Sequence, residues 1–250
     1  MRLTLLGTGN VQGCPVYGCK CSACLRSQQD ARYSRHLCSA LLEHDGKKVL
    51  LDANHPQLQQ LFPAGTIDAI LLTHYHMDHV QALFDLRWGV APSIPVYQPN
   101  DPQGCDDLFK HPGLLQFQPA NQANIPFQLV GVEVMPLTLQ HSKTTLGYCF
   151  NSPQGSIAYL TDTQGIPAES WDYLLEKKPD FIVIDCNNSP LQRPKNHNNL
   201  QDVLTLAERL PNTCWVLTHI SHELDCYLLE YPHCLRDNMV IGHDGLQINL

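Results

Sequence analysis

Three histidines and one aspartate lie within six consecutive positions, directly after the apolar run 70–72. They are His74, His76, Asp78 and His79. Neutral imidazole and carboxylate are the preferred protein ligands of Zn, Mn, Fe and Co. If a strand ends with the apolar run, His74 and His76 can converge on one cation while Asp78 and His79 converge on a second. A solvated, histidine-rich loop is the alternative, but this density of ligand types favours a metal site.

The same pattern, an apolar strand followed by Thr and a ligand, occurs at three places in the chain. The ligands that follow the threonines are His74, Asp162 and His219. His141, which follows a strand-like segment ending at Leu139, is a further candidate. If the two halves of the chain are repeats with ligands at the ends of their strands, both halves would contribute ligands at the one seam where they meet. We therefore expect these residues to complete the site that the histidine cluster begins.

The elements that must position these residues are those of a mixed α/β protein. Alternating or continuous apolar runs predict nine strands. They span 2–6, 48–52, 67–73, 94–97, 132–139, 156–161, 181–185, 214–218 and 247–250. Apolar residues recurring at i, i+3 and i+4 predict helices at 56–62, 80–88, 171–177 and 200–210. The Pro/Gln/Asn-rich stretch 119–126 is predicted to be a surface loop, so residues 1–250 are expected to form a single domain.

Composition limits the classes of function. The 250 residues carry a formal charge of -8, which disfavours broad non-specific binding to nucleic acid. The start of the chain lacks the long apolar core of a signal peptide, and no apolar run reaches the roughly 18 residues of a membrane span. Eleven cysteines, an odd number, indicate reduced thiols and metal binding rather than a disulfide framework. A cytoplasmic enzyme without a membrane partner is the expectation.

The ordered set of ligands resembles the signature of the metallo-β-lactamase superfamily, and the likeness covers most of the chain. This resemblance implies an αββα sandwich, with two mixed sheets flanked by helices and a dinuclear site at one edge. It implies that one metal is bound by His74, His76 and His141, the other by Asp78, His79 and His219, and that Asp162 bridges them. Membership alone leaves the reaction open among hydrolysis, phosphodiester cleavage, redox chemistry and binding.

Three cysteines near the N-terminus predict a second kind of metal site. Cys19, Cys21 and Cys24 have the spacing of a structural zinc knuckle that lacks a fourth ligand. His222, three residues beyond His219, is our candidate for the fourth position, with Cys14 as a weaker rival. Such a Cys₃His zinc would tie the N-terminal loop to the loop that carries His219. Free thiols on a loop are the alternative.

Within the superfamily, the chain most resembles the phosphodiesterases of the bacterial carbon-phosphorus lyase pathway. The segments that carry this likeness are 74–81, 86–90, 104–113 and 217–222, together with the cysteine knuckle. The resemblance implies a small-molecule substrate, 5-phospho-α-D-ribosyl 1,2-cyclic phosphate, hydrolysed to ribose 1,5-bisphosphate during phosphonate catabolism. It also implies a homodimer and two manganese ions in the active site.

Hydrolysis of a phosphodiester gives further residues a role. Two divalent cations supply a nucleophile at neutral pH and neutralise the phosphoryl oxygens, while the leaving alkoxide needs a proton. His197 matches the family's proton-donating histidine, and we assign it as the general acid, with Asp78 also assigned to catalysis. RNA-processing relatives follow this histidine with a glutamate, whereas Asn198 stands here. That departure leaves the orientation and pKa of His197 open.

Residues outside the ligand set are less sharply predicted. Lys143 is the candidate for holding the 5-phosphate because it lies two residues after His141. Other cationic candidates are Arg87, Lys110, Arg193 and Lys195. Asp52 and Asp185 also end strands, and they are predicted to orient metal ligands or loops.

Three other functions remain as alternatives. A pyrroloquinoline quinone biosynthesis B-like protein would share the cysteine-rich knuckle, but the complete set of seven dinuclear ligands disfavours it. Processing of the tRNA 3' end, or hydrolysis of cyclic nucleotides, is a second. The acidic chain and the lack of a basic RNA-gripping insertion disfavour the RNA substrate. A non-catalytic metal-binding scaffold is the third.

Overall fold

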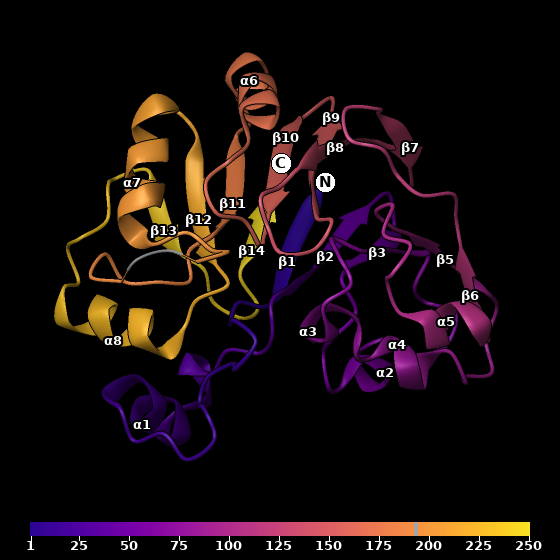
Figure 1. Cartoon of the computed structure of the whole chain (residues 1–250), viewed down its shortest axis with the longest axis horizontal. Helices are drawn as coiled ribbons and strands as arrows, with labels where there is room; N and C mark the ends of the chain where they lie inside the picture. The colour runs from indigo at the N-terminus through magenta and orange to yellow at the C-terminus, as the bar shows by residue number, and fades with distance from the viewer. Residues whose placement is uncertain (193–194) are drawn as a thin grey trace.

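Two seven-stranded β-sheets pack face to face, and helices cover both outer faces (Figure 1). The computed structural model describes residues 1–192 and 195–250. The strand order is β14-β1-β2-β3-β4-β5-β6 in the first sheet and β13-β12-β11-β10-β9-β8-β7 in the second. This is the αββα sandwich that the sequence predicts.

The first sheet combines the N-terminal half of the chain with its last strand. Its strands are β1 (Arg2–Gly7), β2 (Ser39–His44), β3 (Lys47–Leu51), β4 (Ala69–Leu71), β5 (Ile94–Tyr97), β6 (Leu115–Phe117) and β14 (Gln247–Asn249). Strands β3 to β6 pair in parallel, so their carboxyl ends share one edge of the sheet. Asp52 and His74 follow β3 and β4 at that edge.

The second sheet is formed by the C-terminal half. Its strands are β7 (Phe127–Leu129), β8 (Val132–Thr138), β9 (Leu146–Ser152), β10 (Gly155–Leu160), β11 (Phe181–Asp185), β12 (Cys214–Thr218) and β13 (Met239–Ile241). Strands β10 to β13 are parallel, so Asp162, Asp185 and His219 come from the ends of neighbouring strands. The parallel part of each sheet thus delivers polar side chains to one seam.

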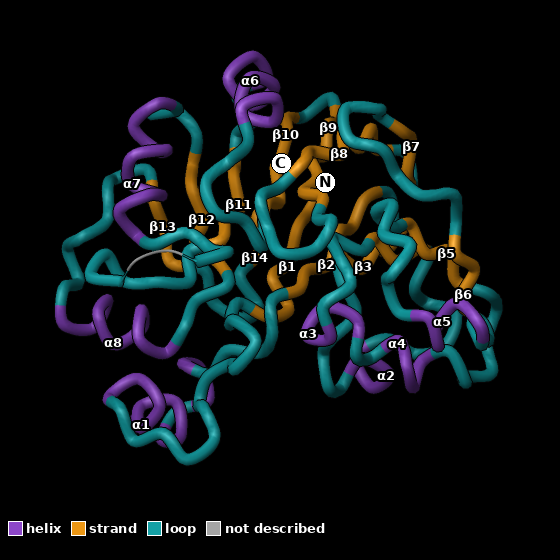
Figure 2. The backbone as a smooth tube through the Cα atoms, viewed as in Figure 1, coloured by secondary structure: helices purple, strands orange, loops and turns teal. Residues whose placement is uncertain are grey.

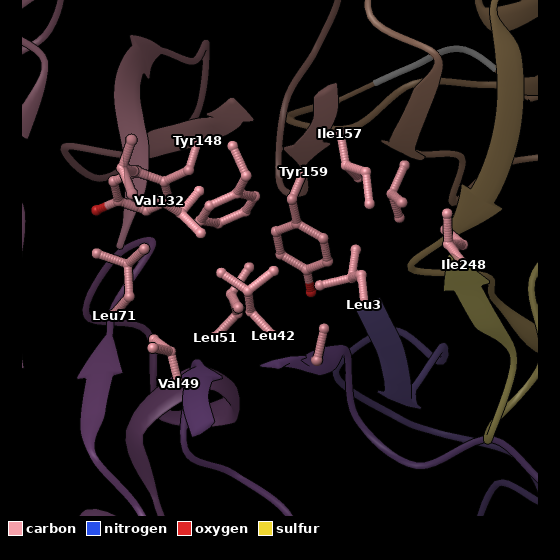
Figure 3. Close-up of a cluster of buried hydrophobic side chains, with 14 of the residues drawn as sticks. Leu3, Leu42, Val49, Leu51, Leu71, Val132, Tyr148, Ile157, Tyr159 and Ile248 are labelled. Carbon is pink, nitrogen blue, oxygen red and sulfur yellow. The ribbon is translucent and has the colours of Figure 1, made fainter. Parts of the chain in front are cut away.

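Apolar side chains fill the space between the two sheets (Figure 3). Leu3, Leu42 and Leu51 from the first sheet meet Tyr148 and Tyr159 from the second, and all five are fully buried. Burying a side chain of this size contributes roughly 1.5–3 kcal/mol. The alternation of inward and outward residues along these strands therefore fixes the register that positions the strand ends.

Two further apolar clusters lie under the helices. The helices are α1 (Ser22–Gln29), α2 (Leu58–Leu61), α3 (Met77–Val80), α4 (Leu83–Leu86), α5 (Asp106–Lys110), α6 (Ala168–Lys177), α7 (Leu200–Arg209) and α8 (His222–Glu230), with a 3-10 turn at Ala31–Tyr33. Helices α2 to α5 cover the first sheet, and α6 to α8 cover the second (Figure 2). Among the described residues, no helix combines the length and apolar character needed to cross a bilayer.

The nine predicted strands are all present, with ends shifted by up to two residues. The helix predicted at 56–62 is shorter, and the one predicted at 80–88 is replaced by α4, preceded by the single turn α3 that carries Asp78 and His79. Helices α1, α5 and α8 and strands β2, β6, β7, β9 and β13 were not predicted. Residues 119–126 form the connection between β6 and β7, in agreement with a loop.

Candidate metal centre and active site

Three polar residues that end strands share an unusual backbone conformation. Asp52, Asp162 and His219 have φ angles of 61°, 62° and 57°. L-residues rarely adopt this left-handed region, although Asp, Asn and His tolerate it better than most. The sharp turn after β3, β10 and β12 directs each side chain into the seam between the sheets, where the neighbouring ligands lie.

The first group of ligand atoms comes from three loops. The Nδ1 atom of His76 lies 2.9 Å from His74 Nε2 and 3.1 Å from His141 Nε2. The Oδ2 atom of Asp162 lies 3.6 Å from His74 Nε2 and 3.5 Å from His141 Nε2. The four atoms lie within 4.8 Å of one another, with His74 and His76 from the loop after β4 and one residue each from the loops after β8 and β10.

A second group adjoins the first and shares its carboxylate. The Nε2 atom of His79 lies 3.6 Å from Asp78 Oδ2 and 3.4 Å from Asp162 Oδ1. The Nε2 atom of His219 lies 3.3 Å from the same Asp162 oxygen. Since the two oxygens of Asp162 face different groups, its carboxylate is placed to bridge two cations.

The donor set fits divalent cations. Among the described residues, the Nε2 atoms of His79 and His219 are buried without a hydrogen-bond partner, a costly state unless something binds them. Burial lowers the pKa of His74 and of His219, which favours the neutral, metal-binding imidazole. Burial opposes ionisation of Asp162, but the nearby His219 and His79 outweigh it and hold its pKa well below the usual range. Neutral imidazoles around an ionised carboxylate are the species that bind a divalent metal.

Asp52 lies behind the second group and fixes the orientation of His79. Its Oδ2 atom is 2.7 Å from His79 Nδ1, and both of its oxygens accept hydrogen bonds from Thr73. Burial opposes a charge on His79, but Asp162 and Asp52 outweigh it and raise its pKa well above the usual value. A cation at Nε2 would replace that proton, while Asp52 continues to accept from Nδ1.

We expect Asp52→Asn to weaken metal binding at the second group while leaving the fold intact. Loss of a carboxylate behind a ligating histidine costs about 10- to 100-fold in metal affinity or activity. The measurement is metal content after dialysis against graded chelator. Asp68→Asn is the matched control, because Asp68 is also a hydrogen-bonded carboxylate beside β3 but contacts Lys47 and Lys48 instead. Equal retention of metal by the two variants would remove Asp52 from this role.

His197 lies next to Asp162 and His219 of the second group, and it contacts Asp185. Its Nδ1 atom is 2.6 Å from Asp185 Oδ2, and its ring stacks on that of His219 with 4.6 Å between centroids. Burial disfavours the imidazolium, but Asp185 outweighs it and raises the pKa of His197 to about 9. The carboxylate of Asp185 thus favours the protonated ring, the form that can donate a proton.

Asn198 uses its side chain to bind backbone groups of neighbouring segments rather than the His197 ring. It is fully buried, donates from Nδ2 to the Asp185 carbonyl and accepts from the Gly165 N–H. The carboxylate partner of His197 is thus Asp185, at the end of β11, rather than the residue that follows it. Sequence reasoning gave Asp185 an orienting role without identifying what it orients.

The predicted knuckle residues converge on one point next to this site. His222 Nδ1 lies 3.4 Å from Cys19 Sγ, 3.4 Å from Cys21 Sγ and 3.7 Å from Cys24 Sγ. Cys14 is not part of this group. Three thiols and one imidazole in this arrangement match the donor set of a closed, structural zinc site.

Helix α8 connects the knuckle to the rest of the molecule. It begins at His222, capped by the Ser221 side chain, only three residues after His219. One turn further on, Asp225 accepts two hydrogen bonds from Arg35, at 2.7 and 2.8 Å, and both side chains are buried. This ion pair, which sequence reasoning missed because its partners are 190 residues apart, holds α8 against the N-terminal loop.

We expect Cys21→Ser to lose one equivalent of zinc and to lower the free energy of unfolding by roughly 2–5 kcal/mol, as loss of a structural metal does. Zinc content and chemical denaturation measure the two effects. Cys234→Ser is the matched control, since Cys234 packs at the edge of the cluster under α6 to α8, away from the knuckle. A Cys21→Ser protein with undiminished zinc and stability would contradict the assignment.

The cationic residues considered for the distal phosphate occupy different places. Lys143 lies at the rim, with Nζ 3.6 Å from Asp101 Oδ2. Arg87 is buried and bound to Asp107, and Lys110 pairs with Asp106. Lys195 is exposed, and Arg193 lies outside the described residues. Lys143 is the candidate that the structure places next to a metal-group loop, because Ser142 beside it lies 3.4 Å from His76 Nε2.

Comparisons with known proteins agree with the fold and with the arrangement of the ligand groups. Residues 47–220 match the family model of the β-lactamase superfamily domain. A solved structure described as a new diphosphatase from the PhnP family is 29% identical, with a TM-score of 0.82, covering 100% of this chain and 97% of that one.

Two curated relatives are longer than this chain. An octanoyltransferase of Porphyromonas gingivalis is 32% identical over 99% of this chain and 51% of that protein. The coenzyme PQQ synthesis protein B of Methylobacterium radiotolerans is 34% identical over 36% of this chain and 34% of its own length. The chain therefore spans about half of the first relative and a smaller part of the second.

The family match covers more than two thirds of the chain and includes strands of both sheets. All seven residues of the two metal groups lie within it: six fall between His74 and Asp162, and His219 lies just before its end. The two sheets and the shared carboxylate agree with it. The chain belongs to the β-lactamase superfamily and resembles its PhnP-family members.

Proposed function

We propose that this protein is a metal-dependent hydrolase that cleaves a phosphodiester of a small sugar phosphate. The observation that carries the proposal is the pair of ligand groups joined by Asp162, with His197 at their open side. Two cations held side by side are suited to a substrate with a phosphoryl centre, because both charged oxygens can be neutralised at once. The likeness to a PhnP-family diphosphatase supports phosphoryl chemistry.

In the proposed reaction the chain supplies ligands and protons. His74, His76 and His141 would hold one cation, and Asp78, His79 and His219 would hold the other. When bound, the cations lower the pKa of a water molecule and neutralise charge on the phosphoryl oxygens. The metals proposed are two Mn²⁺, with one Zn²⁺ in the knuckle. Asp78, at the open side of the second group, can also accept a hydrogen bond from the attacking water.

His197 donates the proton that the leaving oxygen needs. Asp185 holds the ring through Nδ1, so Nε2 carries the proton that faces the second ligand group. After the P–O bond breaks, that proton moves to the sugar oxygen, and the Asp185 carboxylate favours return of a proton to the ring. A proton donor placed in this way contributes about 10²- to 10⁴-fold in rate.

The proposed substrate is 5-phospho-α-D-ribosyl 1,2-cyclic phosphate, converted to ribose 1,5-bisphosphate. Its cyclic diester would lie on the two cations, and its distal phosphate would reach Lys143 at the rim. Asp101 holds that ammonium group at 3.6 Å, too far for a strong hydrogen bond, so the lysine remains available to an incoming phosphate. We also propose that residues 1–250 act as one domain and that the protein is a homodimer.

Activity measured with Mn²⁺ on a panel of substrates tests the proposal. The panel compares ribosyl 1,2-cyclic phosphates with and without the 5-phosphate, 2',3'-cyclic nucleotides, a nucleoside diphosphate sugar and a tRNA precursor. We expect preference for the 5-phosphorylated cyclic ester, and a Lys143→Met variant that loses this preference with little change on the unphosphorylated ester. Preference for the diphosphate sugar or for RNA would overturn the substrate, and no turnover of any would favour a scaffold.

A further inference from the structure

A pocket lies between α1 and α8, and none of the residues of the two ligand groups lines it. It has a volume of about 280 Å³ and is bounded by the end of α1, the turn at 31–35, helix α8 and the end of β13. Three of the chain's eight arginines, Arg26, Arg32 and Arg35, line it. Asp225 is the one carboxylate among its lining residues. In a chain with a net charge of -8, this concentration of guanidinium groups makes a local cationic site.

The three arginines differ in what already holds them. Arg35 is saturated, since it binds Asp225, the Thr8 hydroxyl and the Gly242 carbonyl. Arg32 pairs with Asp30 while its own side chain is 83% exposed, and an exposed pair contributes little. An incoming anion can therefore share or replace Asp30.

Arg26 is the arginine that lacks a partner. Its guanidinium lies over the Tyr33 ring, 4.0 Å from the centroid. Its Nε atom is buried and makes no hydrogen bond to any residue that the structure describes. Among the described residues no carboxylate pairs with this guanidinium, so its remaining N–H donors in the pocket lining are available to an anion.

The walls of the pocket indicate the ligand's chemistry. A guanidinium offers parallel donors that match the oxygens of a phosphate. Leu228, Leu229 and Ile241 contribute apolar side chains to the lining, together with Tyr33. The volume is near the lower end of the roughly 300–1,000 Å³ of ligand sites, so it accommodates a phosphate and one ring, but not a large cofactor. We infer that this pocket binds a small phosphate monoester that carries a ring, such as a mononucleotide.

Binding here would reinforce the zinc knuckle. Arg35 and Asp225 form part of the pocket wall and also fix α8, whose first residue is the knuckle ligand His222. A ligand held between α1 and α8 would link the helices that carry Cys24 and His222, next to the loop that carries Cys19 and Cys21. We therefore expect an occupied pocket to slow the loss of zinc to a chelator.

Calorimetric titration with AMP tests the inference. Because AMP can also bind the dinuclear site, the titration is done in the Asp162→Ala background, with retention of the knuckle zinc checked by metal analysis. We expect one AMP per chain, and an affinity at least about tenfold weaker after Arg26→Gln, the loss of a charge-assisted hydrogen bond. Arg236→Gln is the matched control, because Arg236 pairs with Glu208 at a distant exposed site.

Two readouts decide the result. The inference stands if Arg26→Gln weakens AMP binding, Arg236→Gln does not, and AMP slows chelation of zinc in the wild-type protein. Absence of AMP binding in the Asp162→Ala protein would overturn it, as would equal affinity in the two arginine variants. Arg26→Lys keeps the charge but not the paired donors, so an intermediate affinity in that variant would locate the phosphate at the guanidinium.

Discussion

Replacing Asp162 with alanine should remove both cations of the active site and leave about one zinc per chain. The carboxylate is buried, and its two oxygens lie within 3.6 Å of four histidine nitrogens, two in each group. Without it, two clusters of imidazoles would have to share two cations with only Asp78 as a counter-charge. We expect metal analysis to show a fall from about three equivalents to one, and turnover of the proposed cyclic diester to fall to background.

The controls for Asp162→Ala separate metal loss from unfolding. Asp172→Ala removes an exposed carboxylate from α6 and should keep all metals. The knuckle lies outside the two groups, so its zinc should remain in the Asp162→Ala protein. Loss of the zinc together with the active-site cations would show that the variant fails to fold, and unchanged metal content would refute the bridging role.

Replacing His197 with glutamine should lower kcat by about 10²- to 10⁴-fold while metals and KM stay near wild-type values. The ring contributes a proton and no covalent step, and the two metal groups are complete without it. An activated leaving group such as p-nitrophenolate needs no proton, so a p-nitrophenyl phosphodiester should show a much smaller loss. His233→Gln, an exposed histidine, is the control. Equal losses on both substrates would remove His197 as general acid.

The same pairing predicts the pH dependence. Asp185 raises the pKa of His197 to about 9, and the protonated form is the active one, so kcat should fall as pH rises through that pKa. Bound cations would oppose this rise in the pKa of His197, because they disfavour a nearby positive charge. Asp185→Asn removes the carboxylate, and the descending limb should therefore move to lower pH. A limb at the same pH in both proteins would show that it belongs to another group.

Local sequence was sufficient to predict the strands and to select the side chains that the structure brings together at their ends. His74, Asp162 and His219 each follow an apolar strand and a threonine, so their place at a sheet edge could be predicted without knowing the topology. The knuckle was predictable because three cysteines lie within six positions. The missing ligand, His222, was identified by its nearness to His219 in sequence, and the structure brings it to the thiols.

Contacts between distant residues were not predictable in the same way. The partner of His197 is 12 residues away at the end of β11, and only the parallel pairing of β10, β11 and β12 brings Asp185 next to both His197 and His219. The Arg35–Asp225 pair joins residues that are 190 positions apart in the sequence. Helix α8 was not predicted because three of the four residues in its first turn, 222–225, are polar or charged. They obscure the helical spacing of Leu224 and Leu228.

The left-handed backbone at the ends of β3, β10 and β12 restricts what mutation can do at those positions. Asp52, Asp162 and His219 meet two requirements, because each supplies donor atoms to the site and each adopts a φ angle near +60°. Glutamate at position 162 keeps the charge but loses the short side chain that tolerates this conformation, whereas asparagine keeps the backbone and loses the charge. A survey of all substitutions at these three positions should therefore find that the stability of a variant depends on whether the new residue adopts a positive φ angle, as well as on its charge. Chemical similarity to the original residue alone is then a poor guide to which variants fold.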